Sequence, residues 1–328
     1  MEIQTGRGNI PLITLVGIWS ISALNALPGL AVSPILGQLS VIFPDATELE
    51  IQMVSSLPSL LIIPFIILSG QLTERVNSIK LLQIGLSIFL LSGILYLLSN
   101  KMWQLVVVSG LLGIGSGLIV PLSTGLISHF FTGPYRTKQF GYSSAITNVT
   151  LVLATVLTGY LAEVNWHLPF LVYLFPIVSI FLSFYFKKNI EPKSSVSDTS
   201  DINLSENNIN SSFGRFGIQI KRLIGVMLFY GLSTYLVIII SFNLPFLMKE
   251  YGFSSGRSGI MISLFFLAIM APGLILNKII ERLGNLTEFC SMLSIAVGIL
   301  LILIFRTEWL VGLGCVLAGL GYGVIQPI

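Results

Sequence analysis

Charge is what this sequence of 328 residues lacks most, since Asp, Glu, Lys and Arg together make up only 9% of it. Hydrophobic residues make up 54%, and the mean hydropathy is +0.92. Soluble globular domains carry about 25% charged residues. This composition therefore excludes a soluble domain and predicts an all-α polytopic membrane protein.

Cysteine and histidine are also scarce, with two residues of each. Cys290 and Cys315 both fall in apolar segments, so a disulfide framework is not expected. A membrane-embedded enzyme would need clustered acids or histidines, but His129 and His167 are expected on opposite sides of the membrane with no acidic cluster nearby. We therefore expect no catalytic residues, no metal site and no cofactor.

Long apolar runs dominate what is present, and ten of them are about as long as the ~20 residues that span a bilayer. The first run begins at Ile10 and continues past Val32, which is too long for a secretory signal peptide, the alternative interpretation. The ten predicted helices are 11–38, 51–71, 81–99, 103–128, 141–162, 168–186, 223–248, 259–277, 286–305 and 309–328.

The basic residues are distributed unevenly over the loops between these runs. Thirteen of the 17 fall on the side of the N-terminus; the other side holds Lys101, Lys249, Arg257 and Arg306. The positive-inside rule then places the N-terminus in the cytoplasm of a plasma membrane protein. Because the bases are spread over alternate loops and form no single patch, no nucleic-acid partner is expected.

A polar stretch rich in Ser, Asn and Asp interrupts the apolar pattern, and it predicts a flexible cytoplasmic linker over residues 189–216. It separates a six-helix half, residues 1–188, from residues 217–328, which hold predicted helices 7 to 10.

The two sides of the linker are related by an internal repeat. Residues 111–121 align with 317–327 at an offset of 206 and are identical at six of eleven positions; Glu74 and Arg75 align with Glu281 and Arg282 at an offset of 207. Such a repeat predicts a duplicated six-helix unit. Two complete units need twelve helices, so we expect this ten-helix chain to be C-terminally truncated, without helices 11 and 12.

The charged elbow between the second and third runs resembles a known motif. Residues that fit the pattern Gly-x-Leu-Ala-Asp-Arg-x-Gly followed by basic residues are Gly70, Leu72, Glu74, Arg75 and Lys80. The pattern belongs to the major facilitator superfamily, and the repeat-equivalent loop contains Glu281, Arg282 and Gly284. Thr73, Asn77, Ser78 and Ile79 depart from it.

The resemblance implies the major facilitator fold, with about ten of its twelve helices present, and secondary active transport by a monomer. It also implies that the elbow is a cytoplasmic gate; the alternative is an ordinary solvated loop. Local matches such as Pro28-Gly29-Leu30-Ala31 are similar to bacterial multidrug or metabolite efflux members. Two departures count against proton antiport, namely Ser109 in place of an Arg and Ala154-Thr155 in place of Gly-Pro.

Polar residues at helical spacing mark one face of each of predicted helices 1, 4, 7 and 10, which the resemblance implies line a central substrate cavity. These residues are Ser22, Asn25, Ser109, Ser116, Tyr230, Thr234, Tyr322 and Gln326. The alternative for any one of them is an interhelical hydrogen bond.

Glycines and prolines recur on predicted helices 4 and 10 and serve either close packing or helix bending. They are Gly113, Gly117, Pro121, Gly319, Gly323 and Pro327.

No Asp, Glu, Lys or Arg lies mid-span in any of the ten runs. A neutral cavity suits a small amphipathic or hydrophobic substrate better than a sugar phosphate or a dicarboxylate, which need basic partners. We therefore expect alternating-access export of such compounds, with protons as the candidate coupling ion. Uptake of a neutral metabolite is the alternative, and a non-transporting receptor or sensor of the same fold is a remote one.

Overall fold

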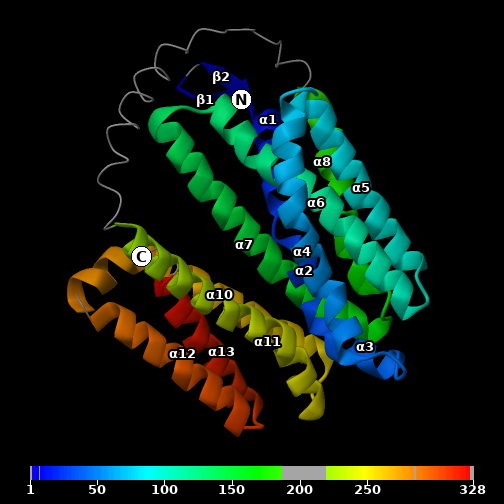
Figure 1. Ribbon diagram of the computed structural model, residues 1–328, viewed down its shortest axis with the longest axis vertical. Coiled ribbons are helices and arrows are strands. Elements are labelled where there is room, and N and C mark those ends of the chain that lie inside the picture. The colour runs from blue at the N-terminus through cyan, green and yellow to red at the C-terminus, as the bar shows by residue number, and fades with distance from the viewer. Residues whose placement is uncertain (1, 7, 187–218, 284–285, 326–328) are drawn as a thin grey trace.

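The computed structural model describes residues 2–6, 8–186, 219–283 and 286–325, and it is a bundle of long helices (Figure 1). The predicted linker lies outside the described residues, as do Gly284, Gln326 and Pro327. Seven of the described helices are long and apolar enough to cross a membrane. The all-α polytopic prediction is therefore confirmed.

An N-terminal group of helices begins with a broken segment and continues with long helices. The long ones are α4 (Glu48–Thr73), α5 (Ser78–Leu98), α6 (Met102–Phe130) and α7 (Gly133–Val164), followed by the 3-10 helix η2 (Leu168–Leu174) and α8 (Pro176–Phe186). A C-terminal group contains α10 (Gln219–Glu250), α11 (Ser255–Leu283), α12 (Thr287–Ile304) and α13 (Glu308–Ile325).

The first predicted helix, 11–38, is wrong as a single helix. The chain forms α1 (Leu12–Leu24), α2 (Leu27–Leu30), the 3-10 helix η1 (Ser33–Ile35) and α3 (Leu36–Ile42). Pro28 has ψ 127° and Gly29 has φ +85°, which only glycine adopts without strain. A Cβ on Gly29 would lie 2.6 Å from the Ser55 carbonyl oxygen, so α4 packs directly on this break.

Two backbone carbonyls at this break accept hydrogen bonds from α7, although the Ser22 oxygen also accepts from the Asn25 nitrogen at 3.1 Å. Thr158 Oγ1 donates to the Ala31 oxygen at 2.7 Å, and Thr147 Oγ1 donates to the Ser22 oxygen at 2.8 Å. Irregular backbone is tolerated at membrane depth where protein groups provide such bonds.

The repeat detected in the sequence is visible in the packing. A Cβ on Gly115 of α6 would lie 2.8 Å from the Phe89 nitrogen of α5. A Cβ on Gly321 of α13 would lie 2.5 Å from the Ser291 oxygen of α12 and 2.8 Å from a side-chain carbon of Ile295. Because Phe89 and Ile295 are also 206 residues apart, α5–α6 and α12–α13 pack through equivalent residues.

The two ends of the bundle differ. We call the end that contains the turn 74–77 the elbow end, and the end that contains the loops 43–47 and 251–254 the far end. The two groups meet near the far end, where α7 packs on α11 and α3 packs on α10. In Figure 1 they diverge toward the ends where α7 and α10 begin.

A short hairpin that the sequence did not predict precedes α1 at the elbow end. Strands β1 (Glu2–Gln4) and β2 (Asn9–Pro11) pair antiparallel. The Thr132 nitrogen donates to the Thr5 oxygen at 3.0 Å. This bond ties the hairpin to the connection between α6 and α7.

Candidate functional site

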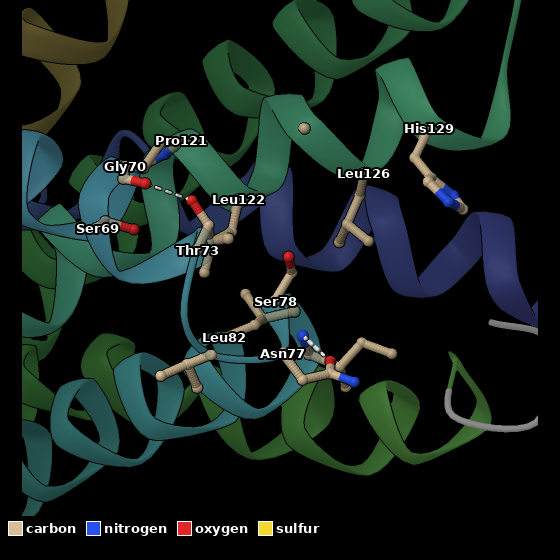
Figure 2. Close-up of a pocket in the computed structure, with 13 residues that line it drawn as sticks. Ser69, Gly70, Thr73, Asn77, Ser78, Leu82, Pro121, Leu122, Leu126 and His129 are labelled. Atoms are coloured by element: carbon tan, nitrogen blue, oxygen red, sulfur yellow. Dashed lines mark hydrogen bonds between the residues drawn. The ribbon is translucent and has the colours of Figure 1, made fainter. Parts of the chain in front are cut away.

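The elbow is held by local hydrogen bonds. Asn77 caps α5 by accepting from the Ile79 nitrogen at 2.9 Å, and Thr73 Oγ1 donates to the Gly70 oxygen at 2.6 Å (Figure 2). Leu72 is half-buried and packs against the hydrophobic core of the N-terminal group. The departures from the family pattern, Thr73 and Asn77, are therefore the residues that shape this turn.

The charged side chains of the elbow point to solvent. Glu74, Arg75 and Lys80 are exposed, and the one ion pair found in the described part of the chain lies elsewhere, between Arg257 and Glu308. A Cβ on Gly70 would meet no atom within 4 Å, so packing does not require glycine there. In this part of the chain, Glu74 therefore forms no ion pair with Arg75 or Lys80.

A pocket of about 470 Å³ lies beside the elbow, between α4, α5 and α6. Its polar lining includes Thr73, Asn77, Ser78 and His129, and Pro121 contributes from α6 (Figure 2). The elbow thus borders a solvent-accessible hollow at its own end of the bundle.

Two of the predicted cavity residues come together where α1 ends. Asn25 Nδ2 donates to Ser123 Oγ at 3.3 Å, and the Ser22 and Ser123 hydroxyls are 3.5 Å apart. The buried Oδ1 atom of Asn25 has no hydrogen-bond partner among the described residues. Sequence reasoning missed Ser123, although it lies seven residues beyond Ser116, which repeats the Ser109-to-Ser116 spacing on the same helix.

A second polar contact lies in the C-terminal group. Thr234 Oγ1 of α10 and the Tyr322 hydroxyl of α13 are 3.3 Å apart. The structure therefore brings these two predicted residues together, as it does Ser22 and Asn25. Tyr230 lies on α10, but its side chain is outside the described part of the structure.

Ser109 and Ser116 are buried inside the N-terminal group. Ser109 Oγ lies 2.6 Å from the Tyr96 hydroxyl and 3.1 Å from the Val54 oxygen, so it joins α6 to α5 and α4; it also lies 2.7 Å from the Leu105 oxygen of its own helix. Ser116 Oγ donates to the Leu112 oxygen of its own helix at 2.7 Å. For Ser109 this geometry supports the interhelical alternative that the sequence left open.

The predicted glycines of α6 pack against α4, and those of α13 pack against α11, the equivalent of α4 in the internal repeat. A Cβ on Gly113 would lie 2.7 Å from the Pro58 oxygen and one on Gly117 would lie 2.5 Å from Phe65 Cβ, both on α4. Gly319 and Gly323 approach the α11 backbone in the same way. Close packing therefore accounts for the glycines, while α6 continues through Pro121 as one helix.

The contact between the two groups involves residues that the sequence did not assign to a site. We call it the inter-group seam: Thr155, Gly159 and Glu163 of α7, with Gly256, Gly259 and Ser263 of α11. The Thr155 and Ser263 hydroxyls are 2.7 Å apart, and Glu163 Oε1 accepts from the Gly256 nitrogen at 3.0 Å. The spacing of small residues, Gly159 on one helix and Gly256 and Gly259 on the other, is the signal that could have indicated it.

Charged residues of the described helices all lie in the first or last two turns. A charge at the centre of a bilayer costs about 2.5 to 3.5 kcal/mol on insertion scales. The middle of the bundle, as far as it is described, thus presents hydroxyl, amide and aromatic groups.

Comparison with known proteins gives a consistent result. The family model described as Major Facilitator Superfamily matches residues 12–328. The quinolone resistance protein NorA of Staphylococcus aureus (strain COL) is 24% identical over 284 residues, which cover 83% of this chain and 68% of that protein. The multidrug transporter protein MdtP of Bacillus subtilis (strain 168) is 30% identical over 108 residues, 33% of this chain and 20% of that protein.

Solved structures share the fold at low identity. The peptide transporter POT in complex with sulfate has a TM-score of 0.68 at 14% identity, covering 96% of this chain and 80% of that one. A bacterial homologue of the human lysosomal transporter Spinster, in an inward-facing and occupied conformation, has a TM-score of 0.66 at 16% identity, covering 95% of this chain and 72% of that one.

Proposed function

The chain belongs to the Major Facilitator Superfamily, and we propose that it is a secondary active transporter that exports small amphipathic or hydrophobic compounds by alternating access. The family, the helical fold and the apolar helices make it a membrane transporter of small molecules. The substrate class and the direction of transport are the proposed part.

The observation that carries the substrate class is the neutrality of the described helix interiors. Ser22, Asn25, Ser123, Thr234 and Tyr322 offer hydroxyl and amide groups, and no charged side chain accompanies them. A substrate with fixed negative charges would lack a basic partner in such a site. An apolar molecule with a few hydrogen-bonding groups would lose little when it leaves water.

The direction of export is supported by the relatives. NorA and MdtP are named for quinolone resistance and multidrug transport, which supports export of foreign compounds by this chain. The positive-inside bias supports a cytoplasmic elbow end. With that orientation, the two groups meet at the extracellular end and diverge toward the cytoplasm. This is the conformation in which an exporter binds substrate from the cytoplasm.

Accumulation of a lipophilic cationic dye in inside-out membrane vesicles that contain the chain tests the proposal. We expect accumulation that depends on an imposed proton gradient and is absent from vesicles without the protein. Asn25→Ala should raise the KM for the dye, since it removes the amide between α1 and α6. Asn243→Ala is the matched control, because that amide donates at 2.9 Å to the Ile239 oxygen of its own helix.

Two outcomes would contradict the proposal. No accumulation with or without the gradient would exclude drug export and favour the alternative, a permease for a neutral metabolite. Gradient-driven accumulation that occurs only in right-side-out vesicles would reverse the direction and make the chain an uptake carrier.

The role of Asn25 is tested separately. Equal KM values for Asn25→Ala and Asn243→Ala would remove Asn25 from the substrate site.

A further inference from the structure

The carboxylate of Glu163 lies at the start of α11, although it belongs to the last turn of α7. Its Oε1 atom accepts from the Gly256 nitrogen at 3.0 Å. Gly256 is the second residue of α11, where backbone N–H groups have no partner within the helix. Glu163 therefore caps a helix of the other group and places its negative charge at the positive end of that helix dipole.

The first turn of α11 contains no acid of its own. It carries Arg257, whose charge is unfavourable at a helix N-terminus and is met by Glu308 of α13 at 3.0 Å. Lys249 of α10 donates to Ser40 Oγ at 2.7 Å and so has a different partner. Within the described part of the chain, Glu163 is thus the carboxylate that caps the N-terminus of α11.

Two glycines allow the capping contact. A Cβ on Gly159 would lie 2.6 Å from the Ser255 oxygen, and a Cβ on Gly259 would lie 2.5 Å from the Thr155 oxygen. The backbones of α7 and α11 therefore touch at the far end. A side chain at either position would force the two helix backbones apart at the place where Glu163 reaches α11.

A second bridge supports the same closure. Ser255 Oγ donates to Gln38 Oε1 at 3.0 Å, and Gln38 Nε2 donates to the Ala162 oxygen at 3.0 Å. Gln38 thereby joins the end of α7 to the start of α11. A pocket of about 320 Å³ borders these groups and leaves room for the Glu163 side chain to move away.

From this geometry we propose that Glu163 is a positioning residue for transport, which holds the far end closed by capping α11 and must release Gly256 each time that end opens. This inference rests on the proposed alternating-access function. The cap joins two groups that separate at this end when access alternates. It therefore stabilises only the far-end-closed conformation and biases the equilibrium between the two conformations.

Distances between spin labels test the inference in the full chain, in lipid, with Cys290 and Cys315 replaced by Ala. One pair, at Asp45 and Thr307, reports on the far end. A second pair, at Thr137 and Leu286, reports on the elbow end. All four labelled residues are exposed.

Glu163→Ala removes both the charge and the hydrogen bond; because the Glu163 side chain is exposed, the population with an open far end should rise about two- to fivefold. Glu163→Gln keeps an acceptor oxygen but loses the charge, so we expect a smaller rise. The distance of the far-end pair should lengthen and that of the elbow-end pair should shorten. Glu250→Gln, which removes an exposed charge at the same end, is the control and should leave both distances unchanged.

Unchanged distances in Glu163→Ala would overturn the inference, as would lengthening of both pairs, which indicates loosening of the whole bundle. The distances do not depend on transport. A change in the label distances without dye export would support the cap and contradict the export proposal. Dye export with unchanged label distances would support the export proposal and contradict the cap.

Discussion

Replacing Ser109 with Ala should destabilise the protein and leave its substrate affinity unchanged. Ser109 and Tyr96 are both fully buried, and their hydroxyls are 2.6 Å apart. Ala at this position leaves the Tyr96 hydroxyl and the Val54 oxygen without this partner. A buried polar group left unpaired costs about 1 to 3 kcal/mol, while polar bonds between membrane helices average about 0.6 kcal/mol. We therefore expect a loss of about 1 to 2 kcal/mol.

The assay is reversible unfolding in mixed micelles, followed by helical circular dichroism, with dye binding measured in parallel. Ser116→Ala is the matched control, because that hydroxyl contacts only the Leu112 oxygen of its own helix among the described residues. It removes the same atom from the same helix, with an expected cost near zero. Equal stability of the two variants, or a change in dye Kd caused by Ser109→Ala alone, would refute the interhelical role of Ser109.

Three further predictions follow from the packing and the charges. Gly115→Ala and Gly321→Ala should lower the melting temperature by similar amounts, because they place Cβ atoms against repeat-equivalent backbones; a large difference would contradict the equivalence. In a complete twelve-helix protein, Glu74→Ala should abolish dye transport without reducing expression, because the resemblance implies that the elbow is a cytoplasmic gate; normal transport by that variant would contradict the gate assignment. Arg257→Ala should cost less than about 1 kcal/mol of unfolding free energy, less still in high salt, because its pair with Glu308 is half exposed; a larger loss would contradict this.

The helices were predictable because their signal is local. Absence of charge over ~20 residues marks a span whatever surrounds it, and all ten predicted segments correspond to helical structure. The break in the first segment was not predicted. Pro28 and Gly29 are tolerated within membrane helices, and whether they interrupt one depends on neighbours such as Ser55 and Thr158.

The candidate site was predictable only in part. Helical spacing marked Ser22, Asn25, Thr234 and Tyr322. In the structure Ser22 and Asn25 both lie within hydrogen-bond distance of Ser123, and Thr234 lies next to Tyr322. The same spacing could not tell a residue that faces a neighbouring helix from one that faces a substrate. Ser109 shows the difference, since its partner Tyr96 lies on another helix.

The sequence by itself determined the membrane class, the helix positions, the internal repeat and the neutrality of the helix interiors, because each depends on composition or on spacing along the chain. Only the tertiary structure decided which end of the bundle is joined. Glu163 lies 93 residues before Gly256, and its role depends on two helices that meet through Gly159 and Gly259. Contacts between distant segments depend on shape and distance in space, which local patterns do not contain.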